Sequence, residues 1–233
     1  MNKALLVNST LVLVLGMAMS PLTSVLAQPQ VKAPIQFDAS KKLLMTKLAN
    51  LDFFSANFTQ EVVSEAGELL EQSSGNLAIS KPNLANWHTQ EPDELTIVSD
   101  GDDVWFYNPW IEQVSVYSLS AAIAKTPILL LTSKDESLWQ QYTVNQEKDK
   151  LQGERFVISA KDPNSQIKSL TLVFSEKDQN SLHSNLSQFS FLDATGQVSH
   201  IKLSNFDAHT APNGNLFNFI IPQDVQLDDQ RAN

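Results

Sequence analysis

Residues 95–108 constrain the fold more than any other part of this chain, because they have the pattern of a tight β-hairpin. Leu95 to Val98 alternate as a strand, and Asp100-Gly101 supplies the positive-φ positions of a two-residue turn. The return strand, Val104 to Tyr107, is apolar on both of its faces. A strand of that kind needs material covering both sides. The sequence therefore predicts a sheet wrapped around an apolar interior.

The first part of the chain combines one helix with strands. Asp38 is an N-cap candidate for a helix over residues 39–50, where leucines recur at helical spacing. Alternation then predicts strands over 54–62 and within 69–80. Residues 118–131 have helical spacing that Thr126-Pro127 interrupts, which predicts two short helices. A third is expected from Ser133 or Asp135 to Gln141.

The second part returns to strands, which we expect over residues 142–146, 155–160, 170–175, 186–192, 197–203 and 216–221. Strands, a helical insert and then strands again indicate an antiparallel sheet whose concave face is covered by short helices. The fold class expected is α+β and mostly β.

The N-terminus has the features of an export signal. Lys3 gives a positive start, and residues 11–19 form an apolar run that is too short to span a bilayer. Val25 and Ala27 fit the small-residue cleavage rule, so residues 1–27 are expected to be a signal peptide and residues 28–233 a single exported domain. A membrane anchor is the alternative, but no second apolar run follows it.

Composition excludes several classes of function. The net charge of −10 argues against binding nucleic acid or anionic lipid head groups. The chain has no cysteine, which removes disulfides and thiol nucleophiles. Its four histidines show no metal-ligand spacing, and neither a G-x-S-x-G elbow nor a phosphate-binding glycine loop is present. We therefore expect no catalytic residue, no metal, no cofactor and no chemical step.

Several exact strings in this chain are distinctive of one protein family. The first group surrounds the hairpin: Pro82-Asn83-Leu84, Asn86-Trp87-His88, Val98-Ser99-Asp100-Gly101, Trp105-Phe106-Tyr107-Asn108-Pro109 and Glu112-Gln113. The others are Phe58-Thr59-Gln60, Thr126-Pro127, Trp139-Gln140-Gln141-Tyr142 and Asp228-Asp229-Gln230-Arg231. In these strings the chain closely resembles the LolA family, the periplasmic carriers that ferry lipoproteins to the outer membrane. The likeness spans nearly all of residues 28–233.

The resemblance implies an incomplete antiparallel β-barrel with a lid of short helices, and a monomeric carrier whose cargo is acylated lipoproteins. It implies loading by an inner-membrane ATP-driven release complex, LolCDE-like, and delivery to an outer-membrane receptor, LolB-like. LolB shares the fold but carries a lipidated cysteine. No cysteine follows Leu26-Ala27 here, so this chain is expected to be the soluble partner.

A lipoprotein carrier needs a large apolar cavity, because each CH₂ removed from water contributes about 0.8 kcal/mol. Candidate lining residues come from the strands and from the lid: Phe54, Phe58, Leu77, Ile79, Trp87, Ile97, Trp105, Phe106, Leu129, Leu130 and Leu131. Apolar periodicity does not separate a cavity wall from a solid core, so the alternative is that these side chains pack against one another. A chaperone or binder of small free lipids would use the same cavity.

Two further residues are assigned roles by the resemblance. LolA proteins usually have an arginine before Pro-Asn, which hydrogen-bonds to the lid backbone and holds the empty cavity shut. Lys81 stands at that position here; it keeps the charge but lacks the planar fork, so a looser latch is expected. The alternative is a solvated lysine at a strand end. Pro127 is a candidate lid hinge, or simply a helix stop.

We predict that Lys81→Leu leaves folding intact but impairs cycling, because it changes the balance between open and closed states. The measurement is the release of bound lipoprotein by the purified variant. Release as efficient as that of the wild type would rule out the latch.

Overall fold

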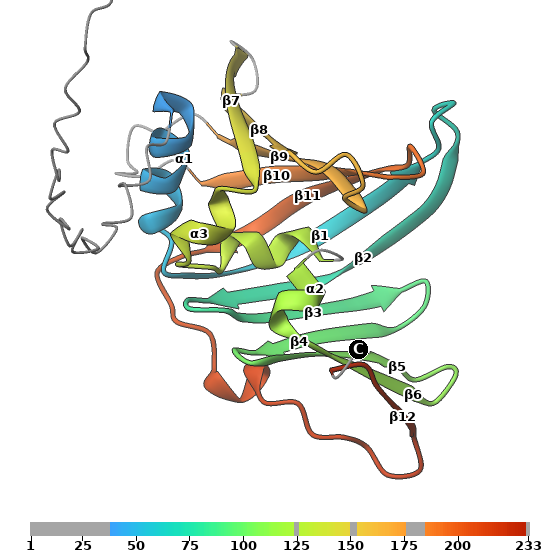
Figure 1. Ribbon diagram of the computed structural model, residues 1–233. Coiled ribbons are helices and arrows are strands. Elements are labelled where there is room, and N and C mark those ends of the chain that lie inside the picture. Colours follow the sequence, from blue (N-terminus) through green and yellow to red (C-terminus); the bar gives the residue numbers. More distant parts are fainter. Residues whose placement is uncertain (1–37, 124–125, 150–152, 176–184, 232–233) are drawn as a thin grey trace, which may run out of the picture. The chain divides into compact units, whose positions relative to one another are not determined.

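A single curved sheet forms most of the protein (Figure 1). Its strands are β1 (Phe53–Val63), β2 (Leu69–Ser80), β3 (Leu84–Glu91), β4 (Leu95–Asp100), β5 (Asp103–Asn108), β6 (Gln113–Ser118), β7 (Tyr142–Asp149), β8 (Gly153–Ala160), β9 (Ile167–Phe174), β10 (Leu186–Asp193), β11 (Val198–Asp207) and β12 (Gln226–Asp229). Their order across the sheet is β12-β6-β5-β4-β3-β2-β1-β11-β10-β9-β8-β7. The sheet does not close, which confirms the predicted incomplete barrel.

The computed structural model describes residues 38–123, 126–149, 153–175 and 185–231. The expected signal peptide, residues 1–27, lies outside the described residues. Residues 35–233 cluster as one compact unit. Within the described ranges, none of the helices has both the length and the apolar character needed to cross a membrane.

Short helices cover the inner side of the curve. The first, α1 (Ala39–Ala49), begins where the Asp38 side chain accepts a hydrogen bond from the Lys41 backbone N–H, as predicted. The lid consists of α2 (Leu119–Ile123), the 3₁₀ helix η1 (Pro127–Leu131) and α3 (Glu136–Trp139). The break before Pro127 separates α2 from η1, which confirms the predicted interruption. Figure 1 shows α2 and α3 lying across the sheet.

The core lies between the lid and the sheet. Leu129, Leu130 and Leu131 are at most 3% exposed, and they join one cluster with residues from α1 and from strands on both halves of the sheet. Phe156 and Phe174 from β8 and β9 meet edge to face, with ring centroids 5.9 Å apart. The lid therefore stays in place chiefly by burying apolar surface.

The predicted position of the hairpin turn was wrong by one residue. The hairpin turn is formed by Gly101-Asp102 rather than Asp100-Gly101, and only Gly101 has positive φ, at 107°. Asp100 instead caps the turn, because its Oδ1 accepts hydrogen bonds from the backbone N–H groups of Asp102 and Asp103.

Residues 216–221 do not form the expected strand. The chain forms the 3₁₀ helix η2 (Gly214–Phe217), because the Asn213 side chain accepts a hydrogen bond from the Asn215 backbone N–H and starts a turn. The last strand is β12 instead, and it pairs with β6 in parallel. Arg231 follows it and bonds both Asp229 and Asp103, so the C-terminal segment docks on β5 and β6.

Gly75 marks a tight approach between β2 and β3. A Cβ placed there would lie 2.0 Å from the carbonyl oxygen of His88, which is part of the β3 backbone. The register between the two strands also shifts at Ser74/Gly75, so a β-bulge sits at the same place. Only glycine fits at this position without displacing a strand.

We predict that Gly75→Ala destabilises the protein by about 3 kcal/mol, because the new methyl group overpacks against backbone that cannot rotate away. The measurement is the midpoint of urea unfolding. Gly214→Ala is the matched control: nothing lies within 4 Å of a Cβ there, so its midpoint should stay close to that of the wild type. Equal midpoints for the two variants would contradict this account of Gly75.

Candidate functional site

A cavity of about 350 Å³ lies between the sheet and the lid. Its apolar wall combines strand residues from both halves of the sheet with residues of η1: Ala85, Trp87, Leu95, Ile97, Phe106, Ile128, Leu129, Phe189 and Phe191. The lid thus provides one side of the cavity and the sheet provides the others.

Trp87 forms the centre of an aromatic group beside the cavity. Its ring lies 4.0 Å from that of Phe58 and meets Phe189 edge to face at 6.2 Å, measured between centroids. The indole N–H donates to the Thr89 Oγ1 at 3.1 Å, so the ring's one polar group is satisfied within the protein. The cavity can therefore present a polarizable apolar surface without an unpaired donor.

The structure divides the residues predicted to line a cavity into three groups. Four of them line it: Trp87, Ile97, Phe106 and Leu129. Six are packed in the core instead: Phe54, Phe58, Leu77, Ile79, Leu130 and Leu131. For those six the solid-core alternative describes the present structure, because periodicity gives the face of a strand but not the depth of the space above it.

Trp105 is the third group: contrary to the prediction, it does not line the cavity. It lies on the opposite face of β5, where it stacks on Phe219 with centroids 5.6 Å apart. Its indole N–H donates to Asp100 Oδ2 at 2.8 Å, and the Arg231 guanidinium lies 5.8 Å from its ring centroid. Adjacent strand residues point to opposite faces, so Trp105 and Phe106 could not both line the cavity.

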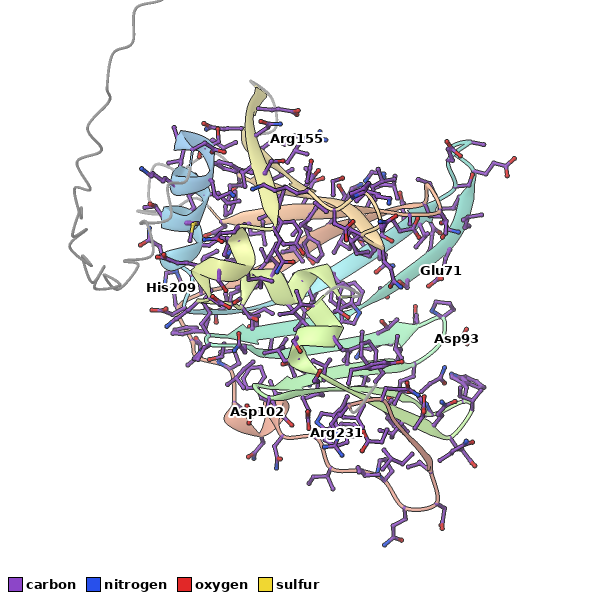
Figure 2. All side chains as sticks on the ribbon, in the orientation of Figure 1. Glu71, Asp93, Asp102, Arg155, His209 and Arg231 are labelled. Atoms are coloured by element: carbon purple, nitrogen blue, oxygen red, sulfur yellow. The ribbon has the colours of Figure 1, made fainter. Side chains whose placement is uncertain are left out.

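Several lining residues were not predicted. Phe189 and Phe191 stand at alternate positions of β10, which was expected as a strand, and this alternation was a signal that could have identified them. The polar residues that line the cavity gave no such signal: Gln60, Glu71, Ser73, Thr89, Asp93, Glu94, Asn108 and Thr126. Three of them, Glu71, Asp93 and Glu94, are exposed and mark the cavity mouth. In Figure 2, Glu71 lies on β2 and Asp93 lies in the turn after β3.

Hydrogen bonds between described residues tie the lid to the rest of the protein. The Leu119 N–H donates to the Asp102 carbonyl at 2.9 Å where the lid begins. The Asn83 N–H donates to the Thr132 carbonyl at 3.2 Å, just after η1. Near its end, the buried Lys41 ammonium of α1 donates to the carbonyl of Trp139 at 3.0 Å. The intervening η1 packs against the sheet through apolar side chains.

Lys81 contacts α1 rather than the 118–141 segment, which differs from the expected bond to the lid backbone. Its ammonium donates to the Leu48 carbonyl at 2.5 Å, in the last turn of the helix, where carbonyl groups lack helical partners and a cation is favoured. Burial lowers the pKa of Lys81 to about 8, although the nearby Asp52 carboxylate opposes that change. Lys81 therefore remains mostly protonated at pH 7.

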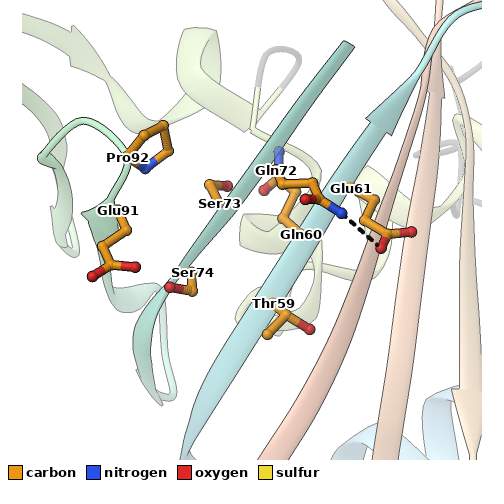
Figure 3. Close-up of a pocket in the computed structure, with 8 residues that line it drawn as sticks. All are labelled: Thr59, Gln60, Glu61, Gln72, Ser73, Ser74, Glu91 and Pro92. Carbon is orange, nitrogen blue, oxygen red and sulfur yellow. Dashed lines mark hydrogen bonds between the residues drawn. The ribbon is translucent and has the colours of Figure 1, made fainter. Parts of the chain in front are cut away.

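A polar surface hollow of about 680 Å³ lies beside the cavity mouth, and Figure 3 shows the residues that line it. It is lined by residues of β1 and β2 and by the end of β3: Thr59, Gln60, Glu61, Gln72, Ser73, Ser74, Glu91 and Pro92. Gln60 and Ser73 belong to both spaces. Among the described residues, no group of three or more His, Asp or Glu side chains is placed to hold a metal ion.

Comparisons with known proteins find a family model, related sequences and solved structures that are similar to this chain. The family model described as "Outer membrane lipoprotein carrier protein LolA" matches residues 49–220. A protein of Aeromonas salmonicida named "Outer-membrane lipoprotein carrier protein" is 38% identical over 81% of this chain and 88% of its own length. A protein of the same name from Shewanella sediminis is 39% identical over 82% of this chain and 86% of its own. A crystal structure of a LolA superfamily protein from Nitrosomonas europaea, 12% identical, covers 77% of this chain and 97% of that chain with a TM-score of 0.47.

We predict a pH dependence of stability that belongs to Lys81. Between its pKa of about 8 in the folded protein and the ordinary value of 10.5, the unfolded chain binds a proton that the native state has lost. The free energy of unfolding should therefore rise with pH across this window. In Lys81→Arg this contribution disappears, because a guanidinium stays protonated.

The measurement is the difference in melting temperature between wild type and Lys81→Arg from pH 7.5 to pH 10. The melting temperature of the wild type should rise relative to that of Lys81→Arg as the pH increases. Lys134→Arg, at a lysine whose side chain is 62% exposed, is the control and should show a constant difference. A constant difference for Lys81→Arg as well would contradict the assignment.

Proposed function

This chain belongs to the LolA family, and from that premise we propose that it is a periplasmic carrier that shelters the acyl chains of lipoproteins. The observation that supports the proposal best is the apolar cavity between the curved sheet and the lid. Lipoproteins released from the inner membrane would be bound there and passed on to an outer-membrane receptor. The carrier would perform no chemical step.

The energetics of acyl chains explain why such a cavity is needed. Burial of each CH₂ contributes about 0.8 kcal/mol, so an anchor of several chains strongly favours an apolar environment. Wall residues such as Trp87, Phe106 and Phe189 would replace the membrane around the chains. The Trp87 indole N–H is already hydrogen-bonded to Thr89, so binding an acyl chain would leave no unpaired donor there.

The size of the cavity indicates that loading requires movement of the lid. Its 350 Å³ lies near the lower end of the roughly 300–1,000 Å³ typical of small-ligand sites. An anchor of several acyl chains needs more room, and η1 is the wall held by apolar packing rather than by a sheet ladder. Pro127, at the first position of η1, is the proposed hinge. Lys81 would hold α1 against β2 and the sheet while the lid moves.

The proposed partners follow from the family. An inner-membrane ATP-driven complex of the LolCDE type would load the carrier, and a LolB-like receptor would unload it. A carrier alone cannot drive net transfer, so the direction would come from ATP at loading and from a better-fitting receptor at delivery. The carrier would work as a monomer.

A second candidate is a binder of small free lipids, which the modest volume of the closed cavity favours. Mass spectrometry of ligand that co-purifies from periplasmic extracts separates the two functions. Acylated lipoprotein supports the carrier, and free fatty acid or phospholipid alone supports the small-lipid binder.

We predict that Phe106→Glu weakens binding of a diacylated lipopeptide by at least about tenfold. The change removes apolar contact worth roughly 1.5–3 kcal/mol and places a charge in the cavity wall. Each 1.4 kcal/mol corresponds to a tenfold change in affinity. The measurement is displacement of a cavity-bound fluorescent fatty acid by the lipopeptide.

Tyr107→Glu is the matched control. Tyr107 is half-buried like Phe106, but it is on the other face of β5, with its ring centroid 6.1 Å from that of Phe219. Its affinity for the lipopeptide should equal that of the wild type. Equal weakening by both substitutions would mean that loss of fold, not loss of the cavity wall, explains the effect.

A further inference from the structure

The hairpin of β1 and β2 extends beyond its neighbour β3. Strand β2 pairs with β1 along its whole length, from Leu69 opposite Val63 to Ser80 opposite Phe53. Its pairing with β3 covers only Ser74 to Ser80 and ends at Ser74 opposite Glu91. Residues 69–73 therefore form an overhang, which lies at the upper right of Figure 1 and carries Glu71 in Figure 2.

The outer edge of the overhang is open. Pro92 follows Glu91 and has no N–H, so β3 cannot continue the ladder alongside it. Within the described ranges no other strand pairs with this edge of residues 69–73. Leu69 and Leu70 are 54% and 51% exposed, and Glu71 and Gln72 are exposed as well. An edge of this kind offers the backbone N–H and C=O groups of alternate residues to another extended chain.

The overhang borders both the polar hollow and the cavity mouth. Ser73 and its partner Gln60 line both spaces, and Glu71 lines the cavity mouth two residues further along β2. Gln72 and Glu61 point to the other face, where their side chains are bonded at 3.3 Å. A chain leaving the apolar cavity past Ser73 and Glu71 would therefore meet the open edge.

We propose that this edge binds the polypeptide segment that follows the acylated residue of the cargo, as an added β-strand. The proposal rests on the proposed function: acyl chains occupy the cavity, and the peptide attached to them lies along residues 69–73. Main-chain hydrogen bonds supply binding that is independent of side-chain identity, which suits a carrier of many different cargo proteins. The polar hollow accommodates the peptide's side chains.

The charge around the mouth selects among peptides. Glu71, Asp93 and Glu94 line the cavity mouth, and Glu91 lines the adjoining hollow. These carboxylates favour a neutral or basic segment and disfavour an acidic one through like-charge repulsion. The occupant is accordingly an extended, uncharged or positively charged peptide.

The test uses residues 28–233 and two ligands, a diacylated lipopeptide with a ten-residue neutral peptide and palmitate. Displacement of a fluorescent fatty acid reports occupancy of the cavity, and amide hydrogen exchange of residues 69–73 reports the edge. We expect both ligands to displace the fluorophore. Only the lipopeptide should slow exchange in the overhang, by tenfold or more at alternate residues.

N-methylation of the peptide backbone supplies a matched control within the ligand. Methyl groups on alternate residues in one register remove the donors that face β2 and should weaken binding about tenfold relative to the parent lipopeptide. Methyl groups on the intervening residues should leave the affinity unchanged. Equal effects of the two registers would overturn strand addition.

A lysine in the peptide should strengthen binding. Glu71→Gln should reduce that preference, because other carboxylates remain at the mouth, whereas Glu68→Gln, in the turn beyond the overhang, should leave the preference unchanged. Displacement of the fluorophore without protection of residues 69–73 would overturn this inference and leave the proposed function standing. Failure of the lipopeptide to displace the fluorophore would overturn the proposed function and the inference with it. Concentration-dependent protection in the ligand-free protein would identify a second copy of this chain as the occupant, and would also overturn the inference.

Discussion

An apolar concave face that the strands cannot bury by themselves is the constraint on which the rest of the structure depends. A closed barrel would fill its interior with side chains from its own strands. Here the sheet ends at β7 on one side and β12 on the other, and the short helices α2, η1 and α3 cover the face between them. A cover made of short helices buries apolar surface without joining the sheet ladder, so it can be displaced at much lower cost than a strand.

Two lysines, the buried Lys41 and the half-buried Lys81, hold the helix α1 in place beside this cover. Lys41 in α1 bonds the Trp139 carbonyl at the end of the lid, and Lys81 in the loop after β2 bonds the Leu48 carbonyl at the end of α1. Desolvation lowers the pKa of both amines, so burial carries a free-energy cost that the bonds to backbone carbonyls offset. With α1 secured at both ends, movement can be concentrated in α2 and η1.

Much of the fold was predictable from local signals, and the cavity was predictable only in part. The Asp38 cap, the break at Pro127 and the alternation of the strands act locally, so the sequence alone contains them. Which face of a strand is apolar is also local, but the depth of space above it depends on helices far along the chain. Phe58 is therefore covered by Trp87, whereas Phe106 borders the cavity.

The same reasoning explains the remaining errors. The residues over 216–221 alternate like a strand, yet the Asn213 turn and the docking of β12 on β6 determine their structure. The partner of Lys81 could not be predicted from its sequence neighbours, because Leu48 is 33 residues away.

Photo-cross-linking in living cells tests the central claim most directly, with a benzophenone side chain at position 106 or, as the control, at position 105. The account predicts acylated lipoprotein cross-linked from position 106 and not from 105; equal cross-linking from both, or none from 106, would contradict it.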